Sequence, residues 1–258
     1  MQDYCGSLGK LNRLLLTEDT VEKIREHKIS LELLSDFREW GSKEDGLSCL
    51  EYLSAYLITG TESKKELEWY YRQLKEYKPE ECKVFTGYLS AVWEDLKYFP
   101  VPLSSVSDAN VSYVDSWMYE RTFGGKRGHE GTDLMASVNQ RGRYPIVSIT
   151  DGVVEKVGWL TKGGYRLGIR SPHGGYFYYA HLYDYARDFQ PGDTIKAGEW
   201  IGFMGDSGYS EVEGTVGNFD VHLHLGIYVN RPDGEEMSIN PYVILQYLED
   251  KKLNYIFD

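Results

Sequence analysis

The sequence of 258 residues has few cysteines, no long apolar run and no excess of positive charge. Its three cysteines, Cys5, Cys49 and Cys82, form no CxxC pair, which argues against a zinc site built from cysteines. No apolar run is long enough to span a membrane, and Leu11–Leu16 is too short for the core of a signal peptide. The formal net charge of -12 argues against nucleic acid or an anionic membrane as the main partner.

What remains is the composition of a globular protein, with 41% hydrophobic and 26% charged residues. Such a chain is long enough to bury a core of its own. Two states of Cys49 and Cys82 stay open: a disulfide between two helices, or two free buried thiols. The 22 tyrosines are interpreted mainly as packing residues, although tyrosines also line grooves that bind polar chains.

The chain falls into two halves with different patterns. Residues 1–99 carry apolar residues at helical intervals, which predicts a helical bundle. Residues 100–111 begin with prolines and continue with small polar residues, which is typical of a linker. Residues 112–258 have many glycines and short β-prone runs, which predicts antiparallel strands in two packed sheets and a short apolar tail. The predicted fold class is therefore α+β, with a helical domain followed by an all-β domain.

Local signals in the helical half mark where helices begin and end. Gly60 follows an apolar stripe and is expected to end a helix. Ser63 and Glu66 form a capping-box pattern at the start of the next helix, and Pro79 is expected to stop it. We expect the apolar stripes of these helices to pack against one another.

The strand-like run 220–229 contains His222 and His224, two of only six histidines in the chain. Residues two apart on a strand face the same side, so both imidazoles are expected to point together while Leu223 and Leu225 pack into the core. Two charged imidazoles would repel each other, and a bound divalent metal removes that conflict for at least one of them. Two ordinary half-exposed histidines are the alternative interpretation of this run taken alone.

His129 and Asp133, four residues apart, form a second cluster. Gly128 and Gly131 argue against a helix here and favour a loop that enters a strand. An even spacing on an extended strand again places both side chains on one face. Two histidines and an aspartate make a three-ligand set that leaves a fourth tetrahedral position open, which is typical of a catalytic zinc site.

The other histidines carry weaker signals. His181 ends an aromatic run and could supply another imidazole near the metal, although a lone histidine there is usually packed or hydrogen-bonded. His27 lies among charged residues and is expected at the surface, and His173 is expected to be exposed in a hairpin turn.

The motifs GHEGTD, YYAHL, GDTIKAGEWIGFMGDSG and HLH occur in the order found in the lysostaphin-type (LytM-like) zinc endopeptidases, which the chain resembles from Trp117 to Tyr242. The resemblance implies a LytM-like peptidase domain over residues 112–258 and one Zn²⁺ ion per chain. It also implies hydrolysis of peptide bonds in bacterial peptidoglycan, in the stem peptide or the cross-bridge. The helical half shows no such resemblance.

By the same resemblance, His129, Asp133 and His224 match the zinc ligands of the family, and His181 and His222 match its two other catalytic histidines. Zinc lowers the pKa of bound water toward about 7 and so supplies a nucleophile at neutral pH. A neutral imidazole can take a proton and return it to the leaving amine, whereas a protonated one can stabilise the oxyanion on the scissile carbonyl. The sequence leaves open which of His181 and His222 has which role.

The chain departs from the family pattern around the histidine pair. Val221 stands where Pro is usual, and Leu225 stands where Phe is usual. Loops 137–144 and 209–220 are longer than usual, and in the family such loops wall the substrate groove. We expect these changes to affect the choice of substrate and not the metal site. The turn Gly205–Gly208 reads GDSG, as in serine proteases, but lacks the His and Asp context of that mechanism.

Other functions stay open at this point. LytM-like domains that have lost the metal include scaffolds and regulators of cell-wall hydrolases or of envelope complexes, but all three ligand positions are retained here. A zinc hydrolase of another class, such as an amidase, has compatible ligands. The helical half is expected to bind a partner or to gate the site. The expected location is the cell envelope or the extracellular space, with any leader absent from this sequence, and a cytoplasmic location stays open.

Overall fold

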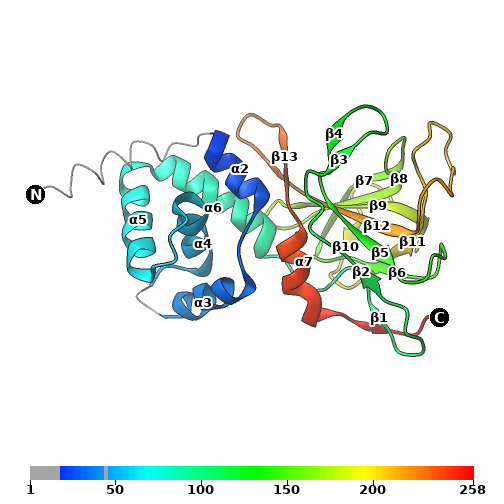
Figure 1. Cartoon of the computed structure of the whole chain (residues 1–258), viewed down its shortest axis with the longest axis horizontal. Coiled ribbons are helices and arrows are strands. Elements are labelled where there is room, and N and C mark those ends of the chain that lie inside the picture. The colour runs from blue at the N-terminus through cyan, green and yellow to red at the C-terminus, as the bar shows by residue number, and fades with distance from the viewer. Residues whose placement is uncertain (1–17, 44–45) are drawn as a thin grey trace, which may run out of the picture. The chain divides into compact units, whose positions relative to one another are not determined.

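The computed structural model describes residues 18–43 and 46–258 (Figure 1). Cys5 and the run Leu11–Leu16 lie outside the described residues. The chain divides into two compact units, with the boundary between Ser90 and Ala91. Within the described ranges, no helix combines the length and the apolar character that crossing a membrane requires.

The first unit is helical, as the sequence predicts. Its helices are α2 (Glu18–Glu26), α3 (Leu31–Gly41), α4 (Cys49–Thr59), α5 (Lys64–Tyr77) and α6 (Pro79–Trp93), which continues past the boundary. Phe37 and Tyr52 stack with their ring centroids 5.8 Å apart, and Leu53 and Leu67 are fully buried. The core of this unit therefore forms from helix faces whose apolar residues repeat every three to four positions.

The helix ends follow the sequence signals only in part. Gly60 ends α4 in the left-handed conformation, with a φ of 71°. The capping box predicted at Ser63 does not form, because the Glu66 carboxylate accepts a hydrogen bond from the Thr61 hydroxyl at 2.7 Å. Pro79 follows the end of α5, and it also occupies the first position of α6, where its missing N–H is not needed.

Some polar groups of the helical unit are buried. His27, expected at the surface, is only 1% exposed. It adopts a φ of 51° directly after α2, and its Nδ1 lies 3.3 Å from the Ile24 carbonyl. Burial lowers the pKa of His27 to about 4. Cys49 and Cys82 are both free thiols, so the disulfide alternative is not formed.

The second unit consists mostly of antiparallel strands. They are β1 (Leu103–Ser104), β2 (Val111–Ser112), β3 (Glu120–Arg121), β4 (Arg127–Gly128), β5 (Thr132–Ala136), β6 (Pro145–Val147), β7 (Gly152–Leu160), β8 (Gly164–Arg170), β9 (Tyr176–Tyr185), β10 (Thr194–Ile195), β11 (Trp200–Met204), β12 (His222–Asn230), β13 (Glu236–Ile239) and β14 (Asn254–Tyr255). The predicted apolar tail forms α7 (Tyr242–Leu248) and the short 3-10 helix η1 (Glu249–Lys251).

Ten of the described strands form one sheet, where the sequence predicted two packed sheets. The order is β10-β7-β8-β9-β12-β5-β2, with β11 paired to β9 and β6, and with β13 paired to β12. The difference arises from the length of β9, whose first half pairs with β12 and whose second half pairs with β11. One continuous network of backbone hydrogen bonds therefore joins both parts.

Residues 100–111, predicted as a linker, contribute to the folded second unit. Strand β1 pairs in parallel with β14, and the Leu103 N–H donates to the Leu253 carbonyl at 2.8 Å. Val101 is only 2% exposed. Proline and serine content alone does not separate a solvated linker from a segment held against a neighbouring strand.

Candidate metal centre and groove

Strand β12 carries His222 and His224 through the middle of the large sheet, between β5 and β9. His224 lies opposite Asp133 on one side and opposite Ala180 on the other. Leu223 is fully buried, so the alternation along the strand directs the two imidazoles to the opposite face, as the period of two predicts. The register brings a histidine and an aspartate side by side although they lie far apart in the sequence.

His129 reaches the same place from the loop between β4 and β5. Its Nδ1 lies 3.1 Å from the Ser116 hydroxyl and 3.2 Å from the Ser116 carbonyl. Because a carbonyl oxygen only accepts, this contact keeps the proton on Nδ1 and leaves the lone pair on Nε2. Ser116 was not anticipated from the sequence, since nothing local marks it as a partner of His129.

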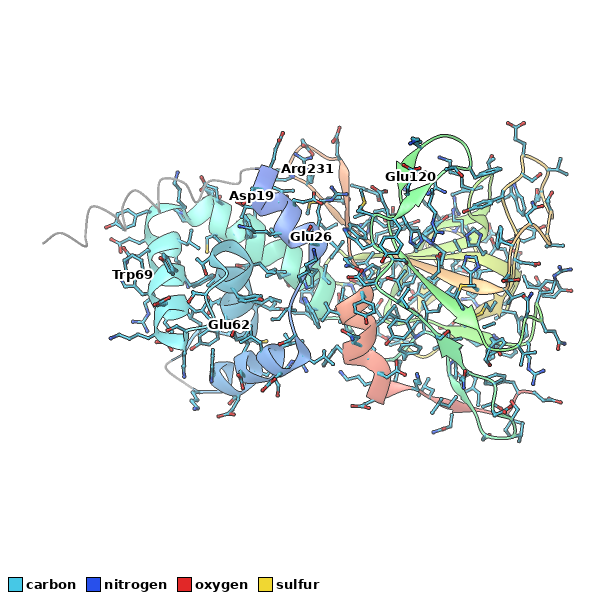
Figure 2. The ribbon with its side chains drawn as sticks, in the orientation of Figure 1. Asp19, Glu26, Glu62, Trp69, Glu120 and Arg231 are labelled. Carbon is cyan, nitrogen blue, oxygen red and sulfur yellow. The ribbon has the colours of Figure 1, made fainter. Side chains whose placement is uncertain are left out.

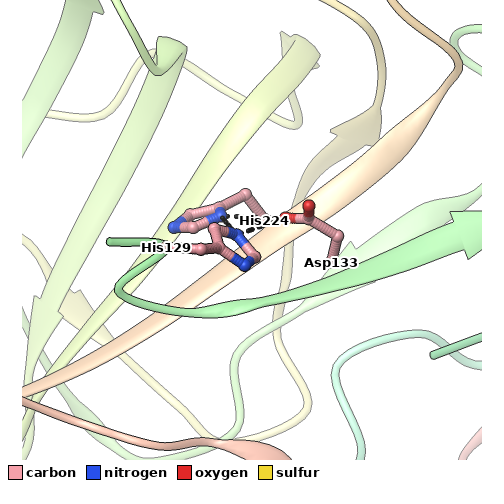
Figure 3. A group of neighbouring side chains, drawn as sticks. All are labelled: His129, Asp133 and His224. Carbon is pink, nitrogen blue, oxygen red and sulfur yellow. Dashed lines mark hydrogen bonds and ion pairs between the residues drawn. The ribbon is translucent and has the colours of Figure 1, made fainter. Parts of the chain in front are cut away.

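His129, Asp133 and His224 bring their donor atoms to one point (Figure 3). His129 Nε2 lies 3.0 Å from Asp133 Oδ1 and 3.0 Å from His224 Nδ1. His224 Nδ1 lies 2.9 Å from Asp133 Oδ1. Two imidazole nitrogens and one carboxylate oxygen form a donor set that zinc accepts in tetrahedral sites.

Asp133 is held in its ionised form. Burial opposes its ionisation, but the close imidazoles of His129 and His224 outweigh burial and hold the pKa of Asp133 well below its ordinary value. Arg121 of β3 forms an ion pair with the other carboxylate oxygen, Oδ2. This ion pair leaves Oδ1 of Asp133 directed at the two histidines. Nothing in the sequence around Arg121 marks it as a partner of Asp133.

A distortion in β9 presents His181 to the site. Its φ of 61° is uncommon for a residue with a Cβ atom, and the pairing of β9 with β8 is irregular at this point. The Nδ1–H of His181 donates to the Ser207 carbonyl at 2.8 Å. Burial, together with the neighbouring His222 and His224, lowers the pKa of His181 well below its ordinary value. His181 is therefore a neutral imidazole whose Nε2 can accept a proton.

His222 is oriented by the same kind of contact. Its Nδ1–H donates to the Asp220 carbonyl at 2.7 Å, and its Nε2 lies 3.8 Å from Asp133 Oδ1. The ring centroids of His181 and His222 are 4.7 Å apart. The structure thus brings together all five side chains that the sequence singled out.

These residues lie in a groove of ≈ 610 Å³. Four tyrosines line it, which is the second role that the sequence analysis left open for this residue type: Tyr176, Tyr178, Tyr209 and Tyr228. Loop 209–220 also supplies Phe219, whose ring centroid lies 4.6 Å from that of His181. The Asn139 amide of loop 137–144 donates to the Asp220 carboxylate at 2.8 Å. The two lengthened loops are therefore joined beside the catalytic histidines predicted from the sequence.

Two other sequence features have no part in this cluster, as expected. Ser207 of the GDSG turn is fully buried, and its hydroxyl donates to the Leu182 carbonyl at 2.6 Å. His173 is exposed on a turn, with its ring nitrogens 2.8 Å from Glu94 and 2.9 Å from Asp95. The hydrogen bond with Asp95 raises the pKa of His173.

The sequence is similar to those of known peptidases. The sequence model of peptidase family M23 matches residues 127–241. An L-Ala–D-Glu endopeptidase of Bacillus subtilis is 40% identical over 152 residues, which are 58% of this chain and 43% of that protein. Lysostaphin of Staphylococcus simulans is 31% identical over 104 residues, which are 40% of this chain and 18% of that protein. The chain spans less than half the length of these curated relatives.

A solved structure resembles almost the whole chain. This structure, from Ruminococcus gnavus, is described as a candidate glycyl-glycine endopeptidase lytM and has 42% sequence identity. The match has a TM-score of 0.76 and covers 92% of this chain and 94% of that one. Because the coverage is so high, the likeness extends into the helical unit, for which the motifs alone gave no relative.

Proposed function

The chain belongs to peptidase family M23, as its lysostaphin-type motifs predict, and we propose that it is a zinc endopeptidase that hydrolyses peptide bonds in bacterial peptidoglycan. The observation that carries this proposal is the convergence of His129, Asp133 and His224 on one point in a groove that also contains His181 and His222. The relatives are named for peptide-bond hydrolysis at L-Ala–D-Glu and at glycyl-glycine bonds.

In this proposal His129, Asp133 and His224 hold one zinc ion. The donor set fits zinc, and the Ser116 carbonyl keeps His129 in the tautomer that offers Nε2 as a ligand. The Arg121 side chain holds the second oxygen of Asp133, which orients the first toward the histidines. When bound, zinc supplies a Lewis acid that polarises a carbonyl group and lowers the pKa of water toward neutrality.

His181 and His222 handle protons beside the metal ligands. Each donates its Nδ1–H to a backbone carbonyl, of Ser207 and of Asp220 respectively. Each therefore turns Nε2 toward the groove as the atom that can take a proton and return it to the leaving amine. Because the partners are backbone atoms, the fold keeps a proton on each Nδ1 while Nε2 takes up and releases its proton.

The location of the protein follows from the proposed substrate. A peptidoglycan hydrolase acts in the cell envelope or outside the cell, which we propose as the location. We also propose that the helical unit binds a partner or gates the groove. Deleting residues 1–90 is then expected to change activity on intact cell walls. Unchanged activity would exclude gating.

The proposal is tested by digestion of purified peptidoglycan, with mass analysis of the released fragments. The wild-type protein is expected to release new amino termini, and His222→Ala is expected to release none. His173→Ala is the matched control, because it removes a histidine of the same unit that lies on an exposed turn away from the groove. If the wild-type protein released no fragments in the presence of zinc, a scaffold would be favoured. If the glycan fragments carried free lactyl carboxylates with no peptide attached, an amidase would be favoured.

A further inference from the structure

The groove has a charge opposite to that of the whole chain. The chain has a formal net charge of -12, yet the groove is lined by five cationic side chains and three carboxylates. The cationic residues are Arg121, Arg127, Lys156, Lys162 and Arg166, and the carboxylates belong to Glu130, Asp133 and Glu236. Basic residues gathered in a groove of an acidic protein create a local positive potential, which attracts anionic groups.

Several of these charges are already matched within the protein. Arg121 forms its ion pair with Asp133. Lys156 lies 3.8 Å from a carboxylate oxygen of Glu236, and Glu236 also lies 3.3 Å from Arg170. These pairs account for two of the five cations of the groove.

Arg166 of β8 is not matched in this way. Among the residues that the structure describes, no carboxylate lies within 4.0 Å of Arg166, and its buried Nε and Nη1 have no hydrogen-bond partner. Buried guanidinium nitrogens without an acceptor are costly, since they lose water and gain no partner. A ligand with a negative charge would supply the missing acceptor.

Arg127 of β4 is the second unmatched guanidinium group at the same place. Its buried Nε also has no hydrogen-bond partner among the described residues. Both arginines line the same groove as Tyr178. The Tyr178 ring centroid lies 6.0 Å from that of His224. The two arginines therefore share the groove with a tyrosine that borders the metal centre.

We propose that Arg166 and Arg127 form a subsite for a carboxylate group of the substrate, so that the protein prefers an acidic stem peptide to a neutral glycine bridge. This inference rests on the proposed peptidase function. Guanidinium groups bind carboxylates through paired, charge-assisted hydrogen bonds. A glycine bridge has no side-chain charge and would leave both arginines unmatched in the groove.

The test uses the full chain and three synthetic peptides. The first is L-Ala–γ-D-Glu–L-Lys, capped at both ends so that the D-Glu residue supplies its one carboxylate. The second has a carboxamide in place of that carboxylate, and the third is pentaglycine. Cleavage is followed as kcat and KM, and binding is measured by calorimetry in the His222→Ala background, where the peptides are expected to stay intact.

The protein is expected to prefer the acidic peptide to its carboxamide by about tenfold or more, because a hydrogen bond to a charged group carries this much affinity. Arg166→Gln is expected to abolish the preference, mainly through KM, and Arg127→Gln is expected to reduce it. Arg231→Gln is the matched control, since Arg231 lies on the turn between β12 and β13 (Figure 2). This control should retain the preference.

The outcomes separate the subsite from the peptidase function. Equal cleavage of the acidic and carboxamide peptides, or a preference for pentaglycine, would overturn the subsite and leave the peptidase function intact. An equal loss for both peptides in Arg166→Gln would also overturn it. Selective binding of the acidic peptide without any cleavage would support the subsite and count against the peptidase function.

Discussion

A methyl group at Gly131 would collide with the metal centre, because this glycine stands between His129 and Asp133. A Cβ atom there would lie 2.5 Å from His224 Cε1, 2.7 Å from His224 Nε2 and 2.6 Å from the Leu225 carbonyl oxygen. Ordinary contact begins at 3.4 Å, so the His224 ring would have to retreat by about 0.9 Å. The carbonyl belongs to the backbone of β12 and cannot move aside in the same way.

Gly131→Ala is therefore expected to lower zinc affinity. Disturbing the groups that orient a metal ligand typically costs about 10- to 100-fold in affinity, and we expect a loss in this range. Zinc affinity is measured by competition with a chromophoric chelator, and thermal unfolding without zinc reports on the fold. Gly87→Ala is the control, because a Cβ atom at Gly87 would meet no atom within 4 Å.

The control should bind zinc as the wild type does. It should also gain up to about 1 kcal/mol of stability, since alanine is the better helix former. If Gly131→Ala bound zinc as tightly as Gly87→Ala while remaining folded, His224 could not be a ligand in the position described.

Further predictions concern the ion pair, the GDSG turn and the buried histidine. Arg121→Gln removes the partner of Asp133 Oδ2 and is expected to lower zinc affinity about tenfold in the same competition assay. An unchanged zinc affinity would count against the role of Arg121 in orienting Asp133. Ser207→Ala is expected to cost about 1–3 kcal/mol in urea unfolding and to keep full zinc affinity, whereas a stable but inactive variant would indicate a serine mechanism. Burial holds the pKa of His27 at about 4 in the folded chain, whereas the pKa is 6.5 in the unfolded chain. As the pH is lowered, the unfolded chain therefore binds the proton first, and the free energy of unfolding decreases between pH 6.5 and pH 4. The loss reaches about 3 kcal/mol, and His27→Asn should lack this component; identical pH profiles would contradict the burial of a neutral ring.

The local pattern predicted what lies on one strand face. The period of two fixed the shared direction of His222 and His224, and the glycines around His129 indicated a loop that enters a strand. The grouping of all five site residues followed from the order of the family motifs. None of this required knowledge of the strand order.

The misses share a physical cause, which is that they depend on contacts between distant segments. Ser116 and Arg121 act through the Nδ1 of His129 and the Oδ2 of Asp133, and nothing in their own neighbourhood marks them. His27 is surrounded by charges in the sequence, but its turn after α2 directs it into the core. The single sheet depends on how far β9 extends past its partners, which periodicity does not reveal.

The most direct test of the central claim is the zinc content per chain, measured by elemental analysis after dialysis. The wild type and His173→Ala are expected to retain about one zinc ion per chain, whereas Asp133→Ala and His129→Ala are expected to retain almost none. Equal zinc content in Asp133→Ala and wild type would contradict the claim that this carboxylate and its two histidines hold the metal.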